Sequence, residues 1–295
     1  MSKVKVLIVG ASGMLGHAII RLLNDDVEQF EVIGTLRGTD TSLYAENMHR
    51  VHFCENVDVL TTTPLNTVFQ IHEPDVVINC VGLIKQRPNA EDPIEAINLN
   101  ALFPHRLAQM CNRFGARLIQ ISTDCVFSGK SGRYSEEDTP DAIDFYGRSK
   151  LLGEVTYGNA VTLRTSIIGH ELYRRDSLLE WFLSQSLPIN GYSKAIFSGL
   201  PTVVLAGVIR DKVIPNVGLK GLFHVSAEPI DKYRLLKLIG EVYEHDIEIN
   251  RHEGVRIDRS LDSTKFRKLT GFEPANWRQM IIDMRDFSNP TLPRF

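Results

Sequence analysis

Short apolar runs alternate with amphipathic segments through the first half of the chain. Val4–Val9 is apolar except for Lys5, a pattern typical of a parallel strand that is buried on both faces. The alternation predicts an α/β protein with a doubly wound parallel sheet of the Rossmann type. The expected strands are Val4–Val9, Glu31–Leu36, Arg50–Phe53, Asp75–Val81, Arg117–Ser122 and Val161–Arg164, and the expected helices are Met14–Leu23, Thr67–His72, Ile94–Phe114 and Tyr146–Tyr157.

The pattern becomes less regular after Thr165. We expect helices at Ser177–Ser186, Pro201–Ile214, Lys232–Glu244, Ser263–Leu269 and Trp277–Phe287, a strand at Leu222–Ser226, and a loop or short strand at Gly191–Gly199. The sequence therefore predicts a dinucleotide-binding domain over residues 1–165, to which residues 201–230 return. Residues 166–200 and 231–295 are expected to form a smaller α/β substrate-binding domain toward the C-terminus.

A glycine-rich turn follows the first strand and precedes the first helix, which is where such a turn indicates a dinucleotide. Gly10 permits a tight turn, Gly13 allows the backbone to approach a pyrophosphate, and Gly16 lets the helix pack close to its strand. An ordinary glycine turn in an α/β protein is the alternative. The cofactor-binding residues expected here are Gly10, Ser12, Gly13, Met14, Leu15 and Gly16.

The end of the second strand indicates which dinucleotide is bound. NAD specificity usually needs a carboxylate there, but the segment reads Gly34-Thr35-Leu36-Arg37. Arg37 can pair with a 2′-phosphate, so we expect NADP (NADPH), with NAD as a weaker possibility and a solvent-facing arginine as the alternative reading. Asp58 and Val59, after the third strand, are expected to contact the adenine edge.

A tyrosine and a lysine stand four residues apart, at Tyr146 and Lys150. This spacing places both on one helix face, where the ammonium favours the phenolate and lowers the tyrosine pKa. Thr123 or Ser122, at the end of a strand, would hold a substrate carbonyl while Tyr146 donates a proton. A solvated helix pair is the alternative, and we interpret the second such pair, Tyr233–Lys237, as a surface feature.

These motifs resemble those of the extended short-chain dehydrogenase/reductases, and most closely the nucleotide-sugar 4-ketoreductases of the dTDP-4-dehydrorhamnose reductase type. The resemblance implies that Thr123, Tyr146 and Lys150 are catalytic and that Asn98 supports the active site. It places the Asn79–Gly82 segment along the cofactor. It places the residues at and after the ends of the predicted strands Arg117–Ser122 and Val161–Arg164 at the substrate. The matching residues include Cys80, Val81 and Gly82 for the cofactor, and Ser122, Thr123, Asp124, Cys125, Thr165 and Ser166 for the substrate.

The resemblance implies an NADPH-dependent reductase of the 4-keto group of a nucleotide-linked deoxysugar, whose product feeds a surface polysaccharide or a glycoside. Lys85 differs from the usual residues beside the substrate and can meet its diphosphate, as can Arg87, Arg174 and Lys194. For each of these four residues taken alone, a surface cation is the simpler reading. A homodimer is expected because relatives often pair through helices.

Two alternatives stay open. Cys125 and His170 resemble the thiol and imidazole of GDP-fucose synthase, so the chain can instead be a nucleotide-sugar epimerase or epimerase-reductase; a buried thiol and a loop histidine are the simpler readings. The other alternative is a non-catalytic NADP-binding regulatory subunit. The intact Thr123, Tyr146 and Lys150 argue against it.

Charge and cysteine usage exclude further classes of protein. The net charge is −3, whereas nucleic-acid binders usually carry a basic patch, so no nucleic-acid partner is expected. The four cysteines have no zinc-like spacing, so no metal is expected. No apolar stretch approaches the roughly eighteen residues of a membrane span and no leader precedes the first strand, so we expect a cytoplasmic protein with no membrane partner.

Overall fold

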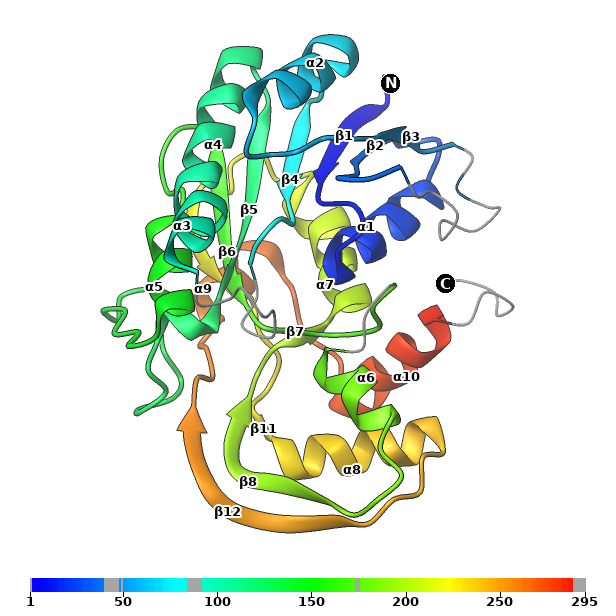
Figure 1. Ribbon diagram of the computed structural model, residues 1–295, viewed down its shortest axis with the longest axis vertical. Helices are drawn as coiled ribbons and strands as arrows, with labels where there is room; N and C mark the ends of the chain where they lie inside the picture. Colours follow the sequence, from blue (N-terminus) through cyan, green and yellow to red (C-terminus); the bar gives the residue numbers. More distant parts are fainter. Residues whose placement is uncertain (1, 40–47, 49, 84–91, 173–175, 289–295) are drawn as a thin grey trace.

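A computed structural model describes residues 2–39, 48, 50–83, 92–172 and 176–288 of the chain. Its centre is a seven-stranded sheet in which every neighbouring pair of strands is parallel. The expected doubly wound parallel sheet is therefore confirmed (Figure 1). In spatial order the strands are β10 (Gly221–His224), β6 (Ala160–Thr165), β5 (Arg117–Thr123), β4 (Val76–Asn79), β1 (Val4–Val9), β2 (Phe30–Thr35) and β3 (His52–Cys54).

Helices cover both faces of this sheet, which explains why its central strands are almost wholly apolar. Val6 and Ile8 of β1 point into one hydrophobic core, while Leu7 and Val9 point into the core on the opposite face. The first core contains α1 (Met14–Asn24) and α7 (Thr202–Val208), which pack against each other, and the second contains α2 (Thr62–His72) and α4 (Phe103–Phe114).

The strand order reverses between β1 and β4, because the chain builds outward from β1 to β3 and then returns to the other side. In open α/β sheets, ligands bind outside the carboxyl ends of the strands at such a reversal. Gly10 follows the end of β1 and Cys80 follows the end of β4, and the two segments are joined by a hydrogen bond from the Cys80 amide to the Val9 carbonyl at 2.9 Å.

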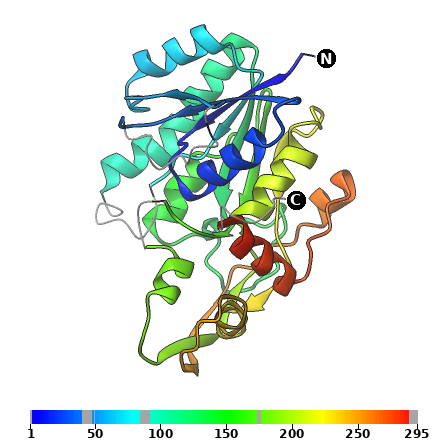
Figure 2. The ribbon, with the colours of Figure 1, turned by 90° about the vertical axis from the view of Figure 1, so that its right-hand side faces the viewer.

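The C-terminal part of the chain adds a second, three-stranded sheet in the order β11-β8-β12. It lies at the end of the molecule away from the N-terminus (Figures 1 and 2), with α8 packed on β8. These elements share a separate hydrophobic core. The bounds are α6 (Leu178–Leu183), β8 (Ile189–Phe197), β11 (Ile230–Asp231), α8 (Lys232–Tyr243), β12 (Ile249–Asp258) and α10 (Trp277–Ser288).

Two of these strands differ from the sequence expectations. The segment expected as a loop or short strand, Gly191–Gly199, overlaps β8, which has nine residues and begins at Ile189. The ten-residue strand β12 was not expected at all. Residues 250–256 of β12 are all exposed, so the strand lacks the alternating pattern that reveals a half-buried strand. Its pairing with β8, rather than local hydrophobicity, defines it.

Several expected helices differ in their interior or their ends. The helix predicted over Thr67–His72 begins five residues earlier, at Thr62. The long helix predicted over Ile94–Phe114 contains a π-helical segment, and so does the helix predicted over Pro201–Ile214. The predicted helix at Tyr146–Tyr157 ends early, at Leu152, and Gly153 is its C-cap residue. A side chain on Gly153 would overlap the Asn100 carbonyl, so the close packing at this end of the helix requires a glycine. The helices and strands not yet given are α3 (Pro93–Ala96), η2 (Ile97–Leu102), η3 (Asp124–Val126), α5 (Phe145–Leu152), β7 (Ile167–Ile168), β9 (Leu200–Pro201), η4 (Ile209–Val213) and α9 (Thr264–Thr270), of which η2 and η4 are the π-helical segments.

Within the described part of the chain, no helix combines the length and the apolar character that crossing a bilayer requires. The same part of the chain shows no group of three or more His, Cys, Asp or Glu side chains placed to hold a metal ion.

Candidate active site

The glycine turn joins β1 to α1, and its three glycines serve different purposes. Gly10 has a φ of +89°, and a Cβ there would come within 2.9 Å of a Val81 methyl group. A Cβ on Gly16 would overlap the Gly10 carbonyl oxygen. On Gly13 the nearest atom would be the Gly10 oxygen at 3.4 Å, an ordinary contact. The protein's own packing therefore requires Gly10 and Gly16, whereas Gly13 has room that a close ligand can use.

The N-terminus of α1 faces the same turn and suits an anion. Gly13 is its N-cap residue, none of the described side chains caps it, and its first turn contains no acidic residue. The amides of Met14, Leu15 and Gly16 are thus the first amides of a helix, where a phosphate is stabilised by N–H groups and by the helix dipole. The Leu15 side chain is buried in the core, so it can contact a cofactor only through its backbone.

The ends of β2 and β3 carry the residues predicted to select the dinucleotide. Arg37 follows β2 and is exposed. The Val57 amide donates to the Leu36 carbonyl at 2.8 Å, which brings Asp58 next to the end of β2. The Asp58 carboxylate accepts from the Leu60 amide at 3.0 Å, and Val59 packs against a small apolar cluster.

The segment after β4 runs from the glycine turn toward the predicted catalytic group. The buried Asn79 amide donates to Gln120 at 2.8 Å and its oxygen accepts from the Val81 amide at 3.1 Å, which fixes the backbone there. Burial raises the pKa of the Cys80 thiol to about 12, although Lys150 opposes the rise. A Cβ on Gly82 would lie 3.7 Å from the Lys150 Nζ. Residues 80–82 therefore connect the two predicted halves of the site. Lys85, Arg87 and Arg174 lie outside the described residues.

Thr123, Tyr146 and Lys150 come together where β5 meets α5. The Thr123 side chain hydrogen-bonds to the Tyr146 phenol, and Lys150 Nζ donates to the Ile121 carbonyl of β5 at 2.8 Å. The helix approaches so closely that a side chain on Gly147 would overlap the Cys125 carbonyl. The strand supplies the hydroxyl and the helix supplies the phenol and the ammonium, as the spacing predicts.

The electrostatics of the pair differ from the expectation that Lys150 acidifies Tyr146. Burial, followed by the nearby Cys125, raises the pKa of Tyr146, and the hydrogen bond from Thr123 only partly opposes this. Burial also lowers the pKa of Lys150 to about 8, against the pull of Glu154. In each group the cost of burying its charge is the largest effect. The phenol is accordingly protonated at neutral pH, which is the form that can donate a proton.

The contacts that support the site from the preceding helix come from Asn100, two residues beyond the predicted Asn98. The buried Asn100 side chain accepts from the Leu83 amide at 2.8 Å and donates to the Ser149 hydroxyl at 3.1 Å. It thereby joins the cofactor-side loop to α5. Both asparagines lie in the π-helical segment η2; π-helical turns are frequent at functional sites. Asn98 is half-buried, and its role stays a prediction.

Two cations from the C-terminal part reach the site, and sequence reasoning missed both. Arg259 follows β12; its Nε donates to the Phe127 carbonyl at 2.8 Å and its Nη1 lies 3.7 Å from the Cys125 sulfur. Lys232 begins α8 and interacts with the charge of Asp124. The segment Leu261-Asp262-Ser263-Thr264-Lys265 begins two residues beyond Arg259 and is similar to a C-terminal signature of the reductase family named above. It was the available signal for Arg259, whereas Lys232 had none.

The residues predicted to contact the substrate do not all face the same way. Ser122 donates to Glu154 at 2.6 Å, and Glu154 binds Arg164 through both carboxylate oxygens at 2.8 Å. The Ser122 hydroxyl is thus occupied by a buried ion pair beneath the site, and we leave it out of the substrate contacts proposed below. Thr165 pairs with Thr123 across neighbouring strands, so it lies at the same sheet edge together with the half-buried Ser166.

The structure does not bring Cys125 and His170 together. His170 is held by Glu180 at 2.7 Å and by the Tyr243 hydroxyl at 2.9 Å, one on each ring nitrogen. Both partners of this imidazole belong to α6 and α8, whereas Cys125 faces Arg259 and Tyr146. Both ring nitrogens are therefore bonded to groups other than the thiol that the epimerase alternative pairs with the imidazole.

The second tyrosine–lysine pair lies on α8, whereas Tyr146 and Lys150 lie on α5. The Lys237 ammonium lies 5.5 Å from the ring centroid of Tyr233. Lys237 is exposed. This surface pair supplies a matched control for Tyr146 and Lys150.

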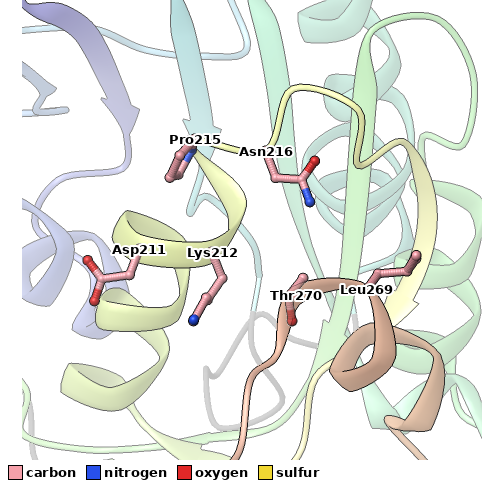
Figure 3. Close-up of a pocket in the computed structure, with 6 residues that line it drawn as sticks. All are labelled: Asp211, Lys212, Pro215, Asn216, Leu269 and Thr270. Atoms are coloured by element: carbon pink, nitrogen blue, oxygen red, sulfur yellow. The ribbon is translucent and has the colours of Figure 1, made fainter.

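A pocket of about 350 Å³ lies elsewhere on the molecule, between η4 and α9 (Figure 3). Pro215 and Asn216 line it, and the carbonyls just before them are bound by Arg117, the first residue of β5. Thr123 is the last residue of the same strand. At about 3.3 Å per residue, roughly 20 Å separate the pocket from the catalytic group, so the pocket is not part of this site.

The parallel sheet with this group at its carboxyl edge defines a fold of the short-chain dehydrogenase/reductase type. The chain belongs to the family described as the RmlD substrate binding domain, whose model matches residues 4–180. It is 28% identical to methionine adenosyltransferase 2 subunit beta of Danio rerio over 81% of this chain and 74% of that protein. It is 32% identical to a dTDP-4-dehydrorhamnose reductase of Streptomyces griseus over 50% of this chain and 43% of that protein.

Solved structures show the same fold. A dTDP-4-dehydrorhamnose reductase from Bacillus anthracis, in complex with NADP, superimposes with a TM-score of 0.78 at 22% identity, covering 96% of this chain and 99% of that one. A hypothetical dTDP-4-dehydrorhamnose reductase from Sulfolobus tokodaii gives a TM-score of 0.75 at 26% identity over 92% and 98% of the two chains.

Proposed function

We propose that the protein is an NADPH-dependent reductase of the 4-keto group of a nucleotide-linked deoxysugar. The observation that carries this proposal is the convergence of Thr123, Tyr146 and Lys150 at the carboxyl edge of the sheet, one short segment away from the glycine turn. A hydroxyl, a protonated phenol and an ammonium suit the reduction of a carbonyl, because hydride addition at carbon needs a proton at oxygen.

The residues around the glycine turn fit a dinucleotide. The pyrophosphate would lie against the first amides of α1, where Gly13 provides the room. The nicotinamide ribose would lie along residues 80–82, within reach of Lys150. Arg37, exposed at the end of β2, supports NADP over NAD because a guanidinium pairs well with a 2′-phosphate. When bound, the nicotinamide supplies the hydride. Structural relatives are described in complex with NADP and with NAD.

The chain's own residues then handle the substrate oxygen and its proton. Thr123 holds the carbonyl, Tyr146 donates the proton to its oxygen, and Lys150 fixes the ribose and the geometry of the phenol. Asp124, Cys125, Thr165 and Ser166 lie at the same sheet edge and are proposed to contact the sugar, as is Lys85. We propose a product that enters a surface polysaccharide or a glycoside.

Paired tyrosine variants test the proposal. Tyr146→Phe removes the donated proton, and we expect the rate of NADPH oxidation with a dTDP-4-keto-6-deoxyhexose to fall by about 10²–10⁴-fold, the usual contribution of general acid catalysis. Tyr233→Phe, in the surface pair, should leave that rate unchanged. If both variants reduce the sugar at the wild-type rate, or if the wild-type protein does not oxidise NADPH with it, the proposal is wrong.

A regulatory subunit is the second candidate, because relatives named methionine adenosyltransferase 2 subunit beta match 81% of this chain. In this reading the protein binds a dinucleotide and acts within another enzyme's assembly. Tyr146→Phe would then leave the function in cells intact, while substitutions in the glycine turn would abolish it. A homodimer and a cytoplasmic location remain predictions.

A further inference from the structure

The Asp124 carboxyl is linked to the Tyr146 phenol through the hydroxyl of Thr123. The Thr123 hydroxyl bonds to Tyr146, donates to Asp124 Oδ1 at 3.2 Å and accepts from the Cys125 amide at 3.1 Å. A hydroxyl has one proton to donate and two lone pairs to accept with, so Thr123 can pass a proton between the carboxyl and the phenol. The three side chains form a continuous line of hydrogen bonds that ends at a carboxyl.

Asp124 lies in surroundings that suit a carboxyl able to gain and lose a proton. It is 8% exposed, which disfavours its charge, but it is the end of the line nearest to two cations. Arg259 from the segment after β12 and Lys232 from the start of α8 both act on it, and Cys125 hydrogen-bonds to it. Burial raises the pKa of Asp124 and the two cations oppose the rise, so neither charge state is prohibitively unfavourable.

We propose that Asp124 supplies the proton that reloads Tyr146 after each reduction, through the hydroxyl of Thr123. The inference rests on the proposed reductase function. Once the phenol has given its proton to the substrate oxygen, the Thr123 hydroxyl turns from Asp124 toward the phenolate, and its O–H proton moves to the phenolate oxygen. The Asp124 carboxyl proton moves to the Thr123 oxygen in the same step. Thr123 ends as a neutral hydroxyl, Tyr146 as a neutral phenol and Asp124 as a carboxylate, which then takes a proton from water.

The direction of this transfer follows from the acidities of the two ends. Burial raises the pKa of Tyr146 above its usual value near 10, whereas a carboxyl remains a far stronger acid even after burial has raised its pKa. Proton movement from Asp124 to a phenolate is therefore downhill. The carboxylate that remains is stabilised by the charges of Arg259 and Lys232, which belong to the C-terminal part of the chain.

Asp124→Asn tests the relay because the amide keeps the hydrogen bond to Thr123 but cannot deliver a proton. The matched control is Asp144→Asn. Asp144 also acts on the charge of Tyr146, and it caps the Gly147 amide at 2.8 Å, a bond that asparagine retains. Stopped-flow absorbance follows NADPH oxidation with an excess of a dTDP-4-keto-6-deoxyhexose. In Asp124→Asn, at a sugar concentration that saturates the variant so that a weakened sugar contact does not limit the rate, we expect the first turnover to be much faster than every later one, because Tyr146 already carries its proton.

Every later turnover of Asp124→Asn should be about 10²-fold slower, so the trace becomes a burst of one NADPH per active site. Asp144→Asn should show no burst and a steady-state rate within about threefold of wild type. Added formate should accelerate the slow phase of Asp124→Gly, since a small acid can replace the missing carboxyl; this second variant also serves if Asp124→Asn folds poorly. Infrared spectra of the protein alone should lose a protonated-carboxyl band in Asp124→Asn and keep it in Asp144→Asn.

The outcomes separate the relay from the reductase. If the wild-type protein oxidises NADPH and Tyr146→Phe does not, but Asp124→Asn behaves like Asp144→Asn, only the relay is overturned. A first turnover of Asp124→Asn that slows as much as its steady state overturns the relay as well, because Asp124 then acts on the hydride-transfer step. A wild-type protein that does not oxidise NADPH overturns both.

Discussion

Replacing Lys150 with methionine should make the protein more stable at neutral pH. The Lys150 side chain is buried, with 8% exposure, and its pKa is lowered from 10.5 to about 8, chiefly by burial. At about 1.4 kcal/mol per pH unit, this difference means that the folded state holds the ammonium at a cost of about 3 kcal/mol. Methionine has a similar length and carries no charge to bury.

The substitution also removes a hydrogen bond, and this loss is the smaller term. Lys150 Nζ donates to the Ile121 carbonyl at 2.8 Å, a bond with a net value of about 1 kcal/mol. The Ile121 oxygen keeps a second donor, the Gln120 amide at 3.2 Å, so it is not left unsatisfied. We therefore expect Lys150→Met to raise the free energy of unfolding by about 1–2 kcal/mol at about pH 7.

The pH dependence gives a sharper signature than the stability at one pH. Below about pH 8 both folded and unfolded states carry the ammonium, so the whole cost is present. Between about 8 and 10.5 the unfolded chain keeps its proton while the folded protein releases it, and stability rises with pH because the unfolded state binds more protons. Across this interval the free energy of unfolding of wild type should rise relative to that of Lys150→Met. At the upper end, wild type should no longer be the less stable protein.

Urea denaturation followed by circular dichroism at about pH 7 and about pH 9.5 measures both effects. Lys237→Met, at the exposed lysine of the surface pair, is the control and should follow wild type at both values. The reasoning is refuted if Lys150→Met is less stable than wild type at the lower pH, or if the difference between the two proteins does not shrink as the pH rises.

Two further pairs of variants separate structural from functional roles. Glu154→Gln breaks the buried pair with Arg164 and should lower the free energy of unfolding by about 3–5 kcal/mol. Glu241→Gln breaks the exposed pair with Arg278, which has the same 2.8 Å separation, and should lower it by under about 1 kcal/mol. Equal effects of the two variants in urea melts would contradict this. Gly16→Ala should destabilise the fold by about 2 kcal/mol or more because its Cβ has no space, while Gly13→Ala should fold normally and bind NADPH at least about tenfold more weakly. Calorimetric titration that shows unchanged NADPH binding to Gly13→Ala would count against a pyrophosphate at this turn.

The main sheet could be predicted from the sequence because its strands are buried on both faces. Val4–Val9 has the predicted bounds, and the strand predicted at Arg117–Ser122 ends one residue later, at Thr123. In such strands local hydrophobicity and tertiary position agree. The spacing of Tyr146 and Lys150 was informative for a similar reason, because a helix fixes which residues share a face.

The parts that could not be predicted depend on contacts between distant segments. β12 is exposed over residues 250–256 and exists because it pairs with β8. Arg259 reaches Cys125 only because the chain after β12 is bonded along the loop that follows β5, for example from the Asp258 amide to the Gly129 carbonyl at 2.8 Å. The predicted shift of the Tyr146 pKa was wrong in direction for a similar reason. The spacing of Tyr146 and Lys150 shows a neighbouring ammonium, but it does not show that both groups are buried.

The costs of these buried groups bear on whether the protein is an enzyme or a binding subunit. A buried ammonium at Lys150, a buried carboxyl at Asp124 and a phenol with a raised pKa at Tyr146 lie within one cluster, and strongly shifted groups gather where chemistry is done. A chain that only bound a dinucleotide would need the turn at Gly10–Gly16 and a group for the ribose, but it would not need a protonated phenol at Tyr146 beside them. If Lys150→Met is more stable and inactive, the lysine is retained at the expense of stability, as expected of a catalytic group. If the same variant is more stable and keeps its full function in cells, the subunit reading gains and the reductase proposal loses its main physical support.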